Sequence, residues 1–222
     1  MTYSYAYPHP AVTTDIVVFT VENQALKVLL IQRKEAPFAG QWALPGGFLA
    51  IDESIDACAA RELEEETGVS GIYLEQLYTF GAPDRDPRER VLSVAYYALM
   101  PLDDVTLRAG SDATAAGWYD VDDLPRLAFD HGEIIAVARD RLTAKMDYST
   151  VGLMFMPGEF TLSEVQSLYE IVSGQTRDKR NFRKWLLGLD ILEETGGKKV
   201  EGAHRPAMLY RLKDKSDVVI TR

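Results

Sequence analysis

A cluster of glutamates within one predicted helix is the feature that most constrains what this chain can fold into and bind. The segment Ser54–Thr67 has helical character, and Gly68 stands where a C-terminal glycine would end the helix. On a helical wheel, Glu62, Glu65 and Glu66 share one face within roughly 100°. Three like charges at this spacing repel one another unless a cation neutralises them, and hard oxygen ligands select Mg²⁺ or Mn²⁺. For the glutamates alone, a solvated acidic helix face is the alternative.

The residues around the glutamates follow a longer pattern. Gly47 is followed after five residues by Glu53, and after seven more by the run Arg61–Val69. Gly46 and Gly47 let the backbone approach the start of the helix closely, and a helix N-terminus favours a phosphate. This spacing resembles the Nudix box with every position filled, and the resemblance to Nudix hydrolases covers about residues 12–145.

The resemblance implies an α/β fold, the Nudix α/β/α sandwich with a mixed sheet. In that family, the glutamates matching Glu62, Glu65 and Glu66 bind metal. The glutamate matching Glu53 pairs with the arginine matching Arg61 and supports the loop. The implied reaction is attack by water on one phosphorus of a nucleoside diphosphate derivative, assisted by Mg²⁺ or Mn²⁺.

A further catalytic carboxylate is expected in the loop at residues 108–118. Related ADP-ribose hydrolases often carry a glutamate three residues before the tryptophan that matches Trp118, where this chain has Ala115. Asp112 is the nearest carboxylate. Either Asp112 serves as the additional ligand or base, or turnover is slow.

The segment at residues 77–88 indicates the nucleotide. Pro83 lies fifteen residues after Gly68, and a proline at about this distance from the box marks the ADP-ribose-hydrolysing branch of the Nudix family. The sequence around Pro83 is similar to that of Nudix proteins of NAD metabolism. Arg85 and Arg88 are predicted to offer forked donors to a diphosphate or ribose phosphate, and Phe80 to stack on adenine. An exposed polar loop whose arginines meet only water is the alternative.

Composition and periodicity divide the chain into two predicted domains, 1–150 and 157–222. Residues 1–158 carry 12 basic and 24 acidic side chains, whereas residues 159–222 carry 12 and 10. The second domain is therefore mildly basic, which suggests a different partner. In the first domain, apolar runs predict four strands and a second helix: Thr13–Thr20, Leu26–Arg33, Val91–Leu99, Trp118–Val121 and the helix Glu133–Leu142.

The order of elements in the second domain predicts a small winged helix-turn-helix. Thr161 and Glu164 form a capping-box pattern at the start of a helix that Gly174 ends. A second helix is predicted at Thr176–Leu187, with Gly188 as its stop. Two short strands complete the domain: Ile191–Glu194 and Met208–Leu212.

The predicted helix Thr176–Leu187 carries a basic face opposite its apolar face. A basic helix face suits the major groove of double-stranded DNA. The predicted DNA-binding residues are Arg177, Lys179, Arg180, Arg183 and Lys184 on the helix, with His204 and Arg205 on the ribbon. On charge alone, a solvated helix in a small packing domain is the alternative. Residues 176–184 and 204–207 are similar to NrtR-type regulators, Nudix–winged-helix repressors of NAD biosynthesis genes that sense ADP-ribose.

The resemblance implies an ADP-ribose-responsive transcriptional regulator of NAD metabolism whose intact box retains Mg²⁺-dependent ADP-ribose diphosphatase activity. A dedicated ADP-ribose pyrophosphatase with a winged-helix module that does not bind DNA is the alternative. Sensing of another ligand, such as a sugar, is a third hypothesis. The family also implies a homodimer on palindromic DNA.

Several features indicate a cytoplasmic location and no membrane partner. No apolar stretch is long enough to span a membrane, and no secretory signal is visible at the N-terminus. Cys58 is the single cysteine, which fits a reducing compartment.

Overall fold

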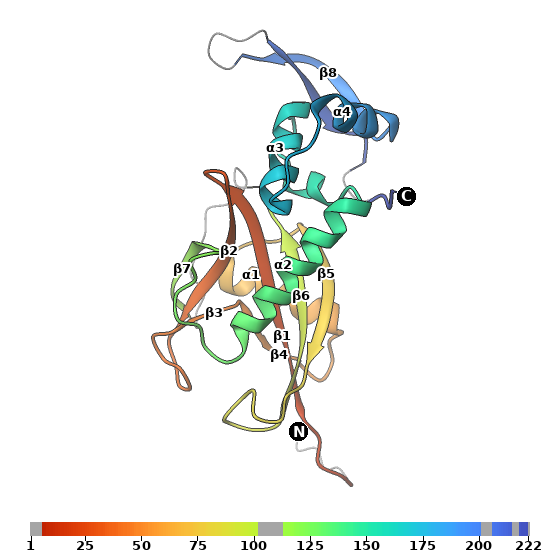
Figure 1. Ribbon diagram of the computed structural model, residues 1–222. Helices are drawn as coiled ribbons and strands as arrows, with labels where there is room; N and C mark the ends of the chain where they lie inside the picture. The colour runs from red at the N-terminus through yellow and green to blue at the C-terminus, as the bar shows by residue number, and fades with distance from the viewer. Residues whose placement is uncertain (1–5, 102–112, 201–205, 215–217, 222) are drawn as a thin grey trace. The chain divides into compact units, whose positions relative to one another are not determined.

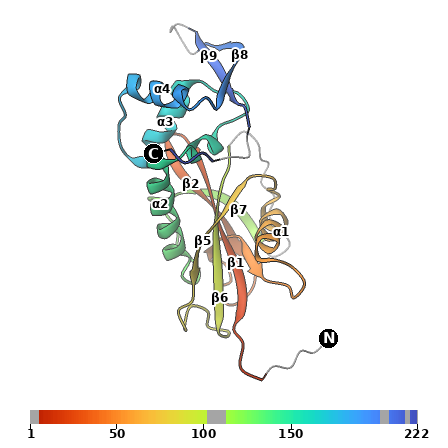
Figure 2. The same ribbon diagram turned by 90° about the vertical axis from the view of Figure 1, so that its right-hand side faces the viewer.

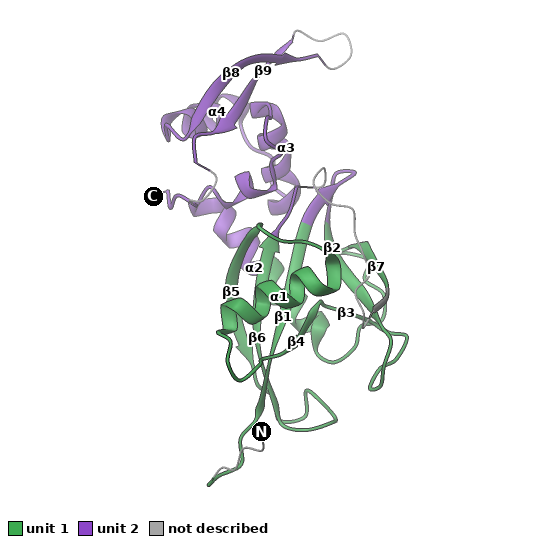
Figure 3. Cartoon of the chain, turned by 180° about the vertical axis from the view of Figure 1, so that it is seen from behind, with its two compact units in different colours: residues 1–19, 27–98, 105–139 green, residues 20–26, 99–104, 140–222 purple. Residues whose placement is uncertain are grey.

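The computed structural model describes all residues except 1–5, 102–112, 201–205, 215–217 and 222 (Figure 1). The chain divides into two compact units (Figure 3). The first comprises Met1–Phe19, Lys27–Ala98 and Val105–Arg139, and the second comprises Thr20–Leu26, Leu99–Asp104 and Asp140–Arg222. Helix α2 (His131–Tyr148) contributes residues to both units. No helix in the described part of the chain is long and apolar enough to cross a membrane.

The first unit is built on a sheet that has seven strands in the described residues. The strands are β1 (Ala11–Glu22), β2 (Ala25–Arg33), β3 (Trp42–Ala43), β4 (Gly46–Phe48), β5 (Tyr73–Phe80), β6 (Val91–Leu99) and β7 (Ala113–Asp120). Their order is β3-β2-β1-β6-β5, with β4 paired to β1 and β7 paired to β2. Strands β1 and β2 are neighbours in this sheet, and the residues between them, Asn23 and Gln24, have φ of 51° and 61°, as a tight hairpin turn requires. The expected α/β fold with a mixed sheet is confirmed.

Helix α1 (Ile55–Thr67) and the first part of α2 lie on opposite faces of this sheet (Figure 2). The Ser54 side chain accepts a hydrogen bond from the Ala57 N–H, and Gly68 closes the helix in the left-handed conformation with φ 75°. The apolar face of α1 is buried through Cys58, Ala59 and Leu63. The predicted helix and its end at Gly68 are confirmed, while Ser54 is the N-cap rather than the first helical residue. Its glutamates are thereby held beside β4.

The second unit contains the helices and ribbon of a winged helix. Its elements are the 3₁₀ turn η2 (Val151–Phe155), α3 (Leu162–Ser173), α4 (Lys179–Gly188), β8 (Leu192–Lys199) and β9 (Ala207–Leu212). The capping box of Thr161 and Glu164 is formed at the start of α3, and Gly174 ends that helix with φ 66°. β8 and β9 pair in antiparallel fashion, with a register shift between Glu194 and Lys198.

The sequence-based boundaries of α4 were wrong at both ends. The helix begins at Lys179 rather than Thr176, because the Asp178 side chain accepts from the Asn181 N–H at 2.8 Å and caps it. Gly188 belongs to the last turn, and Leu189 is the residue that ends the helix. Strand β8 also runs five residues beyond the predicted Glu194, because it continues through the two glycines.

Candidate functional site

A cavity of about 250 Å³ in the first unit adjoins the glutamate helix. Strands β1, β2 and β4, helix α1, the segment after β5 and the start of α2 all contribute to it. Its lining combines carboxylates, cations and aromatic rings. The lining includes Thr13, Asp15, Arg33, Lys34, Gly46, Gly47, Phe48, Glu62, Glu66, Arg85, Arg88, Phe129 and His131.

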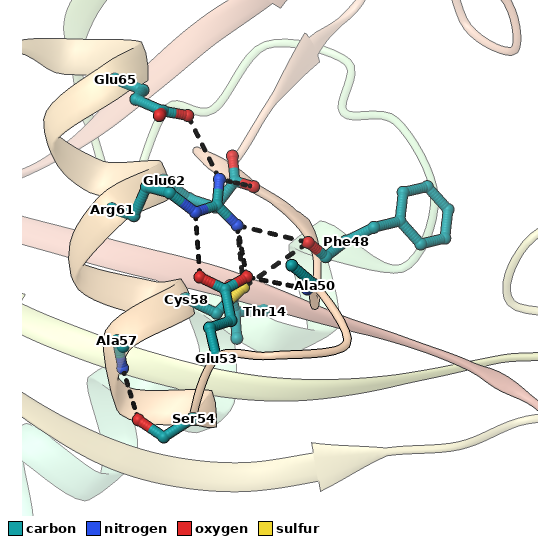
Figure 4. Close-up of polar contacts among 10 residues, drawn as sticks. All are labelled: Thr14, Phe48, Ala50, Glu53, Ser54, Ala57, Cys58, Arg61, Glu62 and Glu65. Atoms are coloured by element: carbon teal, nitrogen blue, oxygen red, sulfur yellow. Dashed lines mark hydrogen bonds and ion pairs between the residues drawn. The ribbon is translucent and has the colours of Figure 1, made fainter. Parts of the chain in front are cut away.

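Arg61 joins three carboxylates of the box (Figure 4). Its guanidinium forms a two-point pair with Glu53, through Nη2–Oε1 at 2.6 Å and Nε–Oε2 at 3.0 Å. Its Nη1 also donates to Glu62 at 2.7 Å and to Glu65 at 3.2 Å. These contacts with Arg61 lower the pKa of the Glu53 carboxyl to about 2. Glu53 also accepts from the Ala50 N–H at 2.8 Å, so the pair fixes the loop before α1.

Glu62 and Glu66 are the box carboxylates that line the cavity. Glu66 is buried, and its Oε2 accepts from the Gly46 N–H at 2.7 Å. Burial raises the pKa of the Glu62 carboxyl, although Arg61 opposes that shift. Glu65, by contrast, has a side chain that is 61% exposed. A partly buried carboxylate such as Glu62 gains most from a nearby cation.

Two glycines allow this close packing for different reasons. A Cβ on Gly46 would lie 2.1 Å from the Thr14 carbonyl oxygen, and a Cβ on Gly47 would lie 2.2 Å from Glu62 Oε1. The first clash is with the backbone of β1, which has little room to move. The second is with the end of a side chain, which can turn away.

We therefore expect Gly46→Ala to lower the free energy of unfolding by about 3 kcal/mol, since overpacking against backbone is relieved only by distortion. Gly47→Ala should leave stability nearly unchanged but displace the Glu62 carboxylate and weaken Mn²⁺ binding by about 10-fold or more. Denaturant unfolding and calorimetric Mn²⁺ titration measure the two effects. Equal behaviour of the two variants in both measurements would contradict this assignment.

The donor set suits a hard divalent cation, but Arg61 interacts with part of it. Among the described residues, no group of three or more metal-ligating side chains is placed to hold an ion. Arg61 Nη1 is bonded to both Glu62 and Glu65. The carboxylate chemistry and the burial of Glu62 and Glu66 nevertheless fit Mg²⁺ or Mn²⁺. A metal would compete with Nη1 for the two glutamates, while the two-point pair with Glu53 could remain.

Cations and aromatic rings supply another part of the cavity lining. The Arg88 guanidinium lies 5.2 Å from the Phe48 ring centroid and 5.7 Å from that of Phe129. The Arg33 guanidinium lies 5.0 Å from the same Phe129 ring. Phe129 has φ of 49°, an uncommon conformation for a bulky residue. Stacked arginines of this kind are suited to phosphates and planar bases.

Arg85, which was predicted to contact the ligand, is buried and paired with carboxylates of the protein. Its side chain is 3% exposed and makes a two-point pair with Asp130, through Nη2–Oδ1 at 2.7 Å and Nε–Oδ2 at 2.9 Å. Nη2 also donates to Asp15 at 3.2 Å, and Asp15 accepts from the Ser93 hydroxyl. Arg85 lines the cavity, but its guanidinium is committed to this buried network.

His131, the first residue of α2, belongs to the same network. Its Nδ1 accepts from the Leu44 N–H at 2.8 Å, so the neutral ring carries its proton on Nε2, which lies 3.4 Å from Asp15 Oδ1. Burial lowers the pKa of His131, with Arg85 and Arg33 acting in the same direction and Asp15 and Asp130 opposing it.

The folded chain should therefore keep His131 neutral at pH values where the unfolded chain protonates it. Since the pKa is lowered from its usual 6.5, this contribution to stability is complete above pH 6.5 and is lost as the pH falls towards the folded pKa. The slope is about 1.4 kcal/mol per pH unit in that window. Denaturant unfolding between pH 7 and pH 5 tests this, with His131→Gln as the comparison. A wild-type curve parallel to that of the variant would contradict it.

The structure does not place every predicted ligand or catalytic residue at the cavity. Phe80 is buried at the end of β5, with its ring 5.5 Å from that of Tyr78, and neither Phe80 nor Pro83 lines the cavity. Asp112 lies outside the described residues. Of the predicted ligand residues, Gly46, Gly47, Arg85 and Arg88 do line it.

Several cavity residues were missed by sequence reasoning. They are Thr13, Asp15, Arg33, Lys34, Phe48, Phe129 and His131. The Thr13 hydroxyl is buried and has no hydrogen-bond partner among the described residues. The only sequence signal was a polar or charged residue at the end of an apolar strand, as at Arg33.

The predicted DNA-binding residues separate into three groups. Arg177 precedes α4, donates to Asp147 at 2.9 Å and lies over the Tyr169 ring. The four predicted residues of α4 itself are Lys179, Arg180, Arg183 and Lys184, and all but the half-buried Arg183 are exposed. His204 and Arg205 lie outside the described residues.

Comparison with known proteins agrees with this two-part organisation. Residues 9–138 match the family model described as NUDIX domain, and residues 152–212 match the NrtR DNA-binding winged helix domain. The chain is 38% identical to the ADPR responsive transcriptional repressor NtrR of Acinetobacter baylyi, over 92% of this chain and 83% of that protein. The chain belongs to the NrtR family.

Solved structures of the NrtR family extend the likeness to three dimensions. Shewanella oneidensis NrtR complexed with a 27mer DNA is 40% identical, with a TM-score of 0.80 over 91% of this chain and 93% of that one. The Nudix domain of the same protein complexed with ADP ribose is also 40% identical, with a TM-score of 0.57 over 62% of this chain and 91% of that one. The predicted resemblance to NrtR-type regulators is confirmed.

Proposed function

We propose that this chain is a transcriptional regulator of NAD metabolism whose Nudix unit binds ADP-ribose and whose winged-helix unit binds double-stranded DNA. The observation that carries the proposal is the pairing of a Nudix domain with an NrtR-type winged helix in one chain. Supporting features are the stacked arginines, the partner-free Thr13 hydroxyl and the exposed cations of α4. A regulator of this kind acts in the compartment that holds the DNA, so the predicted cytoplasmic location belongs to the same proposal. The predicted homodimer belongs to it as well, because two winged helices would bind the two halves of a palindromic site.

Recognition of ADP-ribose in the cavity follows from the chemistry of its lining. Arg33 and Lys34 offer donors to the diphosphate, and Phe129 and Phe48 offer faces to the base or ribose. Arg88 makes a two-point pair with Asp86 through Nε and Nη2, which leaves Nη1 as its donor for a phosphate. The buried network of Arg85, Asp130 and His131 holds the segments that carry these residues. Thr13 supplies a hydroxyl donor or acceptor.

Hydrolysis is the second part of the proposal, and the intact box supports it. Glu62, Glu65 and Glu66 would hold Mg²⁺ or Mn²⁺, which polarises phosphate oxygens and lowers the pKa of water when bound. Arg61 then keeps Glu53 and the loop before α1 in place, and the Gly46 N–H keeps Glu66 oriented.

A DNA mobility-shift experiment tests the regulatory function. DNA from the chain's own upstream region should form a sequence-specific complex that ADP-ribose alters. The absence of a specific complex, both with and without ADP-ribose, would exclude a regulatory role.

A dedicated ADP-ribose pyrophosphatase is the second candidate, and the complete box is the observation that favours it. In that case, AMP and ribose 5-phosphate should be released from ADP-ribose with Mg²⁺, and the winged helix should have no DNA affinity. A wild-type protein that binds ADP-ribose but leaves it uncleaved would rule this candidate out.

A further inference from the structure

A second cavity, of about 700 Å³, lies within the winged-helix unit. It is bordered by the start of α3, one side of α4, the end of β8 and the start of β9 (Figure 3 labels these elements). The lining is cationic and hydroxyl-bearing and contains no carboxylate: Thr161, Leu162, Ser163, Lys179, Arg183, Lys199, Pro206, Ala207, Met208 and Tyr210.

Three cations from two different elements meet at this cavity. Lys179 and Arg183 are one turn apart on α4, and Lys199 ends β8. Arg183 Nη2 donates to the Ser163 hydroxyl at 3.0 Å, and Arg183 Nε has no acceptor among the residues described. The contact with Ser163 therefore holds the Arg183 guanidinium at the cavity.

The position of the ribbon beside α3 is fixed by two contacts. Phe160 and Tyr210 exchange two backbone hydrogen bonds, at 2.9 and 2.8 Å. Lys199 pairs with Glu164, whose carboxylate also caps α3 through the Thr161 N–H. The ion pair with Glu164 orients Lys199. Glu164 itself does not line the cavity, so the lining keeps an excess of positive charge.

The other two cations of α4 are placed differently. Arg180 and Lys184 are exposed and do not line this cavity. On a helical wheel they lie roughly 60–140° farther from the middle of the buried face of Phe182 and Leu186 than Lys179 and Arg183 do. The basic residues of α4 thus form two sets with different surroundings.

We infer that the second cavity is a seat for one backbone phosphate of bound DNA, held by Lys179, Arg183 and Lys199, while Arg180 and Lys184 face the bases. Cations and hydroxyls held in place by the protein suit a backbone phosphate, because every DNA duplex presents this group in the same geometry whatever its sequence. Exposed long side chains on a recognition helix suit base edges. The inference rests on the proposed DNA-binding function and assigns separate tasks to its residues.

The test places a negative charge in the seat without disturbing the fold. Ser163→Asp puts a carboxylate in the first turn of α3, where it is compatible with the helix, whereas it would face an incoming phosphate. Ser167→Asp makes the same charge change one turn later on an exposed position of α3, outside the cavity, and is the matched control. Lys179→Gln and Arg180→Gln form a second matched pair on α4.

Fluorescence anisotropy should be measured with the upstream DNA and with a mixed-sequence duplex at several salt concentrations. Ser163→Asp should weaken binding to both duplexes by at least about 10-fold, because like charges are brought together, and Ser167→Asp much less. Lys179→Gln should weaken both duplexes by a similar factor and lower the salt slope by about 1. Arg180→Gln should instead reduce discrimination between the two duplexes.

The outcomes separate this inference from the function on which it rests. If the wild-type protein binds neither duplex, the DNA-binding function and the phosphate seat are both wrong. If the wild-type protein binds DNA but Ser163→Asp binds as tightly as Ser167→Asp, the seat alone is wrong. A loss in Lys179→Gln that is confined to the upstream DNA would also overturn the seat.

Discussion

Replacing Glu66 with glutamine is expected to reduce ADP-ribose hydrolysis by at least about 100-fold. Loss of an outer partner of a metal site costs 10- to 100-fold, and loss of a ligand carboxylate should cost at least the upper value. The glutamine Oε1 can still accept from the Gly46 N–H, so the loop that holds the site should remain in place. The measurement is AMP release from ADP-ribose at saturating Mg²⁺.

Glu64→Gln is the matched control for this prediction. Glu64 lies on the same helix, is exposed and does not line the cavity, so hydrolysis should stay within about 2-fold of wild type. Unfolding of both variants should be measured alongside activity. Full activity in a folded Glu66→Gln variant would contradict the assignment of Glu66 as a metal ligand.

Asp130→Asn should lower the free energy of unfolding of the Nudix unit by about 3 kcal/mol. Removing one partner of a buried ion pair leaves an uncompensated charge, and such changes typically cost 3–5 kcal/mol. The low end applies because Asp15 remains as a second partner of Arg85. Tryptophan fluorescence during denaturant unfolding reports on this unit through Trp42 and Trp118 when it is measured in a Trp185→Phe background, which removes the signal of α4.

An exposed ion pair of the same unit provides the comparison. Arg139 and Asp122 are in contact at 2.6 Å, but their side chains are 42% and 71% exposed. Asp122→Asn should therefore change stability by less than about 1 kcal/mol. Equal losses in Asp130→Asn and Asp122→Asn would show that the Arg85 network is not a buried support of the site.

The parts of the fold that depend on local rules were predictable from sequence. Ser54 and Gly68 bound α1, and Thr161 with Glu164 opens α3, because each cap is formed by side chains and backbone groups a few residues apart. The box carboxylates were predictable for a similar reason. Their spacing on one helix already places them on one face.

The errors arose where contacts distant in sequence decide the structure. The start of α4 was misplaced because Thr176 and Asp178 are both plausible caps, and the contacts of Arg177 with Glu170 and Asp147 favour the later one. Strand β5 was not predicted, since apolar and polar residues do not alternate strictly in the sequence of Tyr73–Phe80. Phe80 was consequently assigned to a ligand loop although it lies in the core.

The residues that line the cavity could not be predicted for the same reason, because they come together only in the folded chain. Arg33 ends β2 and Phe129 precedes α2, and no spacing rule links two residues so far apart in the chain. The Arg85–Asp130 pair likewise joins residues 45 apart in sequence. The sequence therefore predicted which helix face carries the box carboxylates but not the residues that complete the cavity around them.

Titration of ADP-ribose into a complex of this protein with its upstream DNA, while AMP release is followed, tests whether the Nudix unit is a sensor. We predict that ADP-ribose alters the DNA complex at concentrations that fill the Nudix cavity. The response should persist in Glu66→Gln although AMP release stops, since sensing requires binding rather than turnover. A complex that is unchanged at saturating ADP-ribose in both proteins would contradict the claim that the Nudix unit is a sensor.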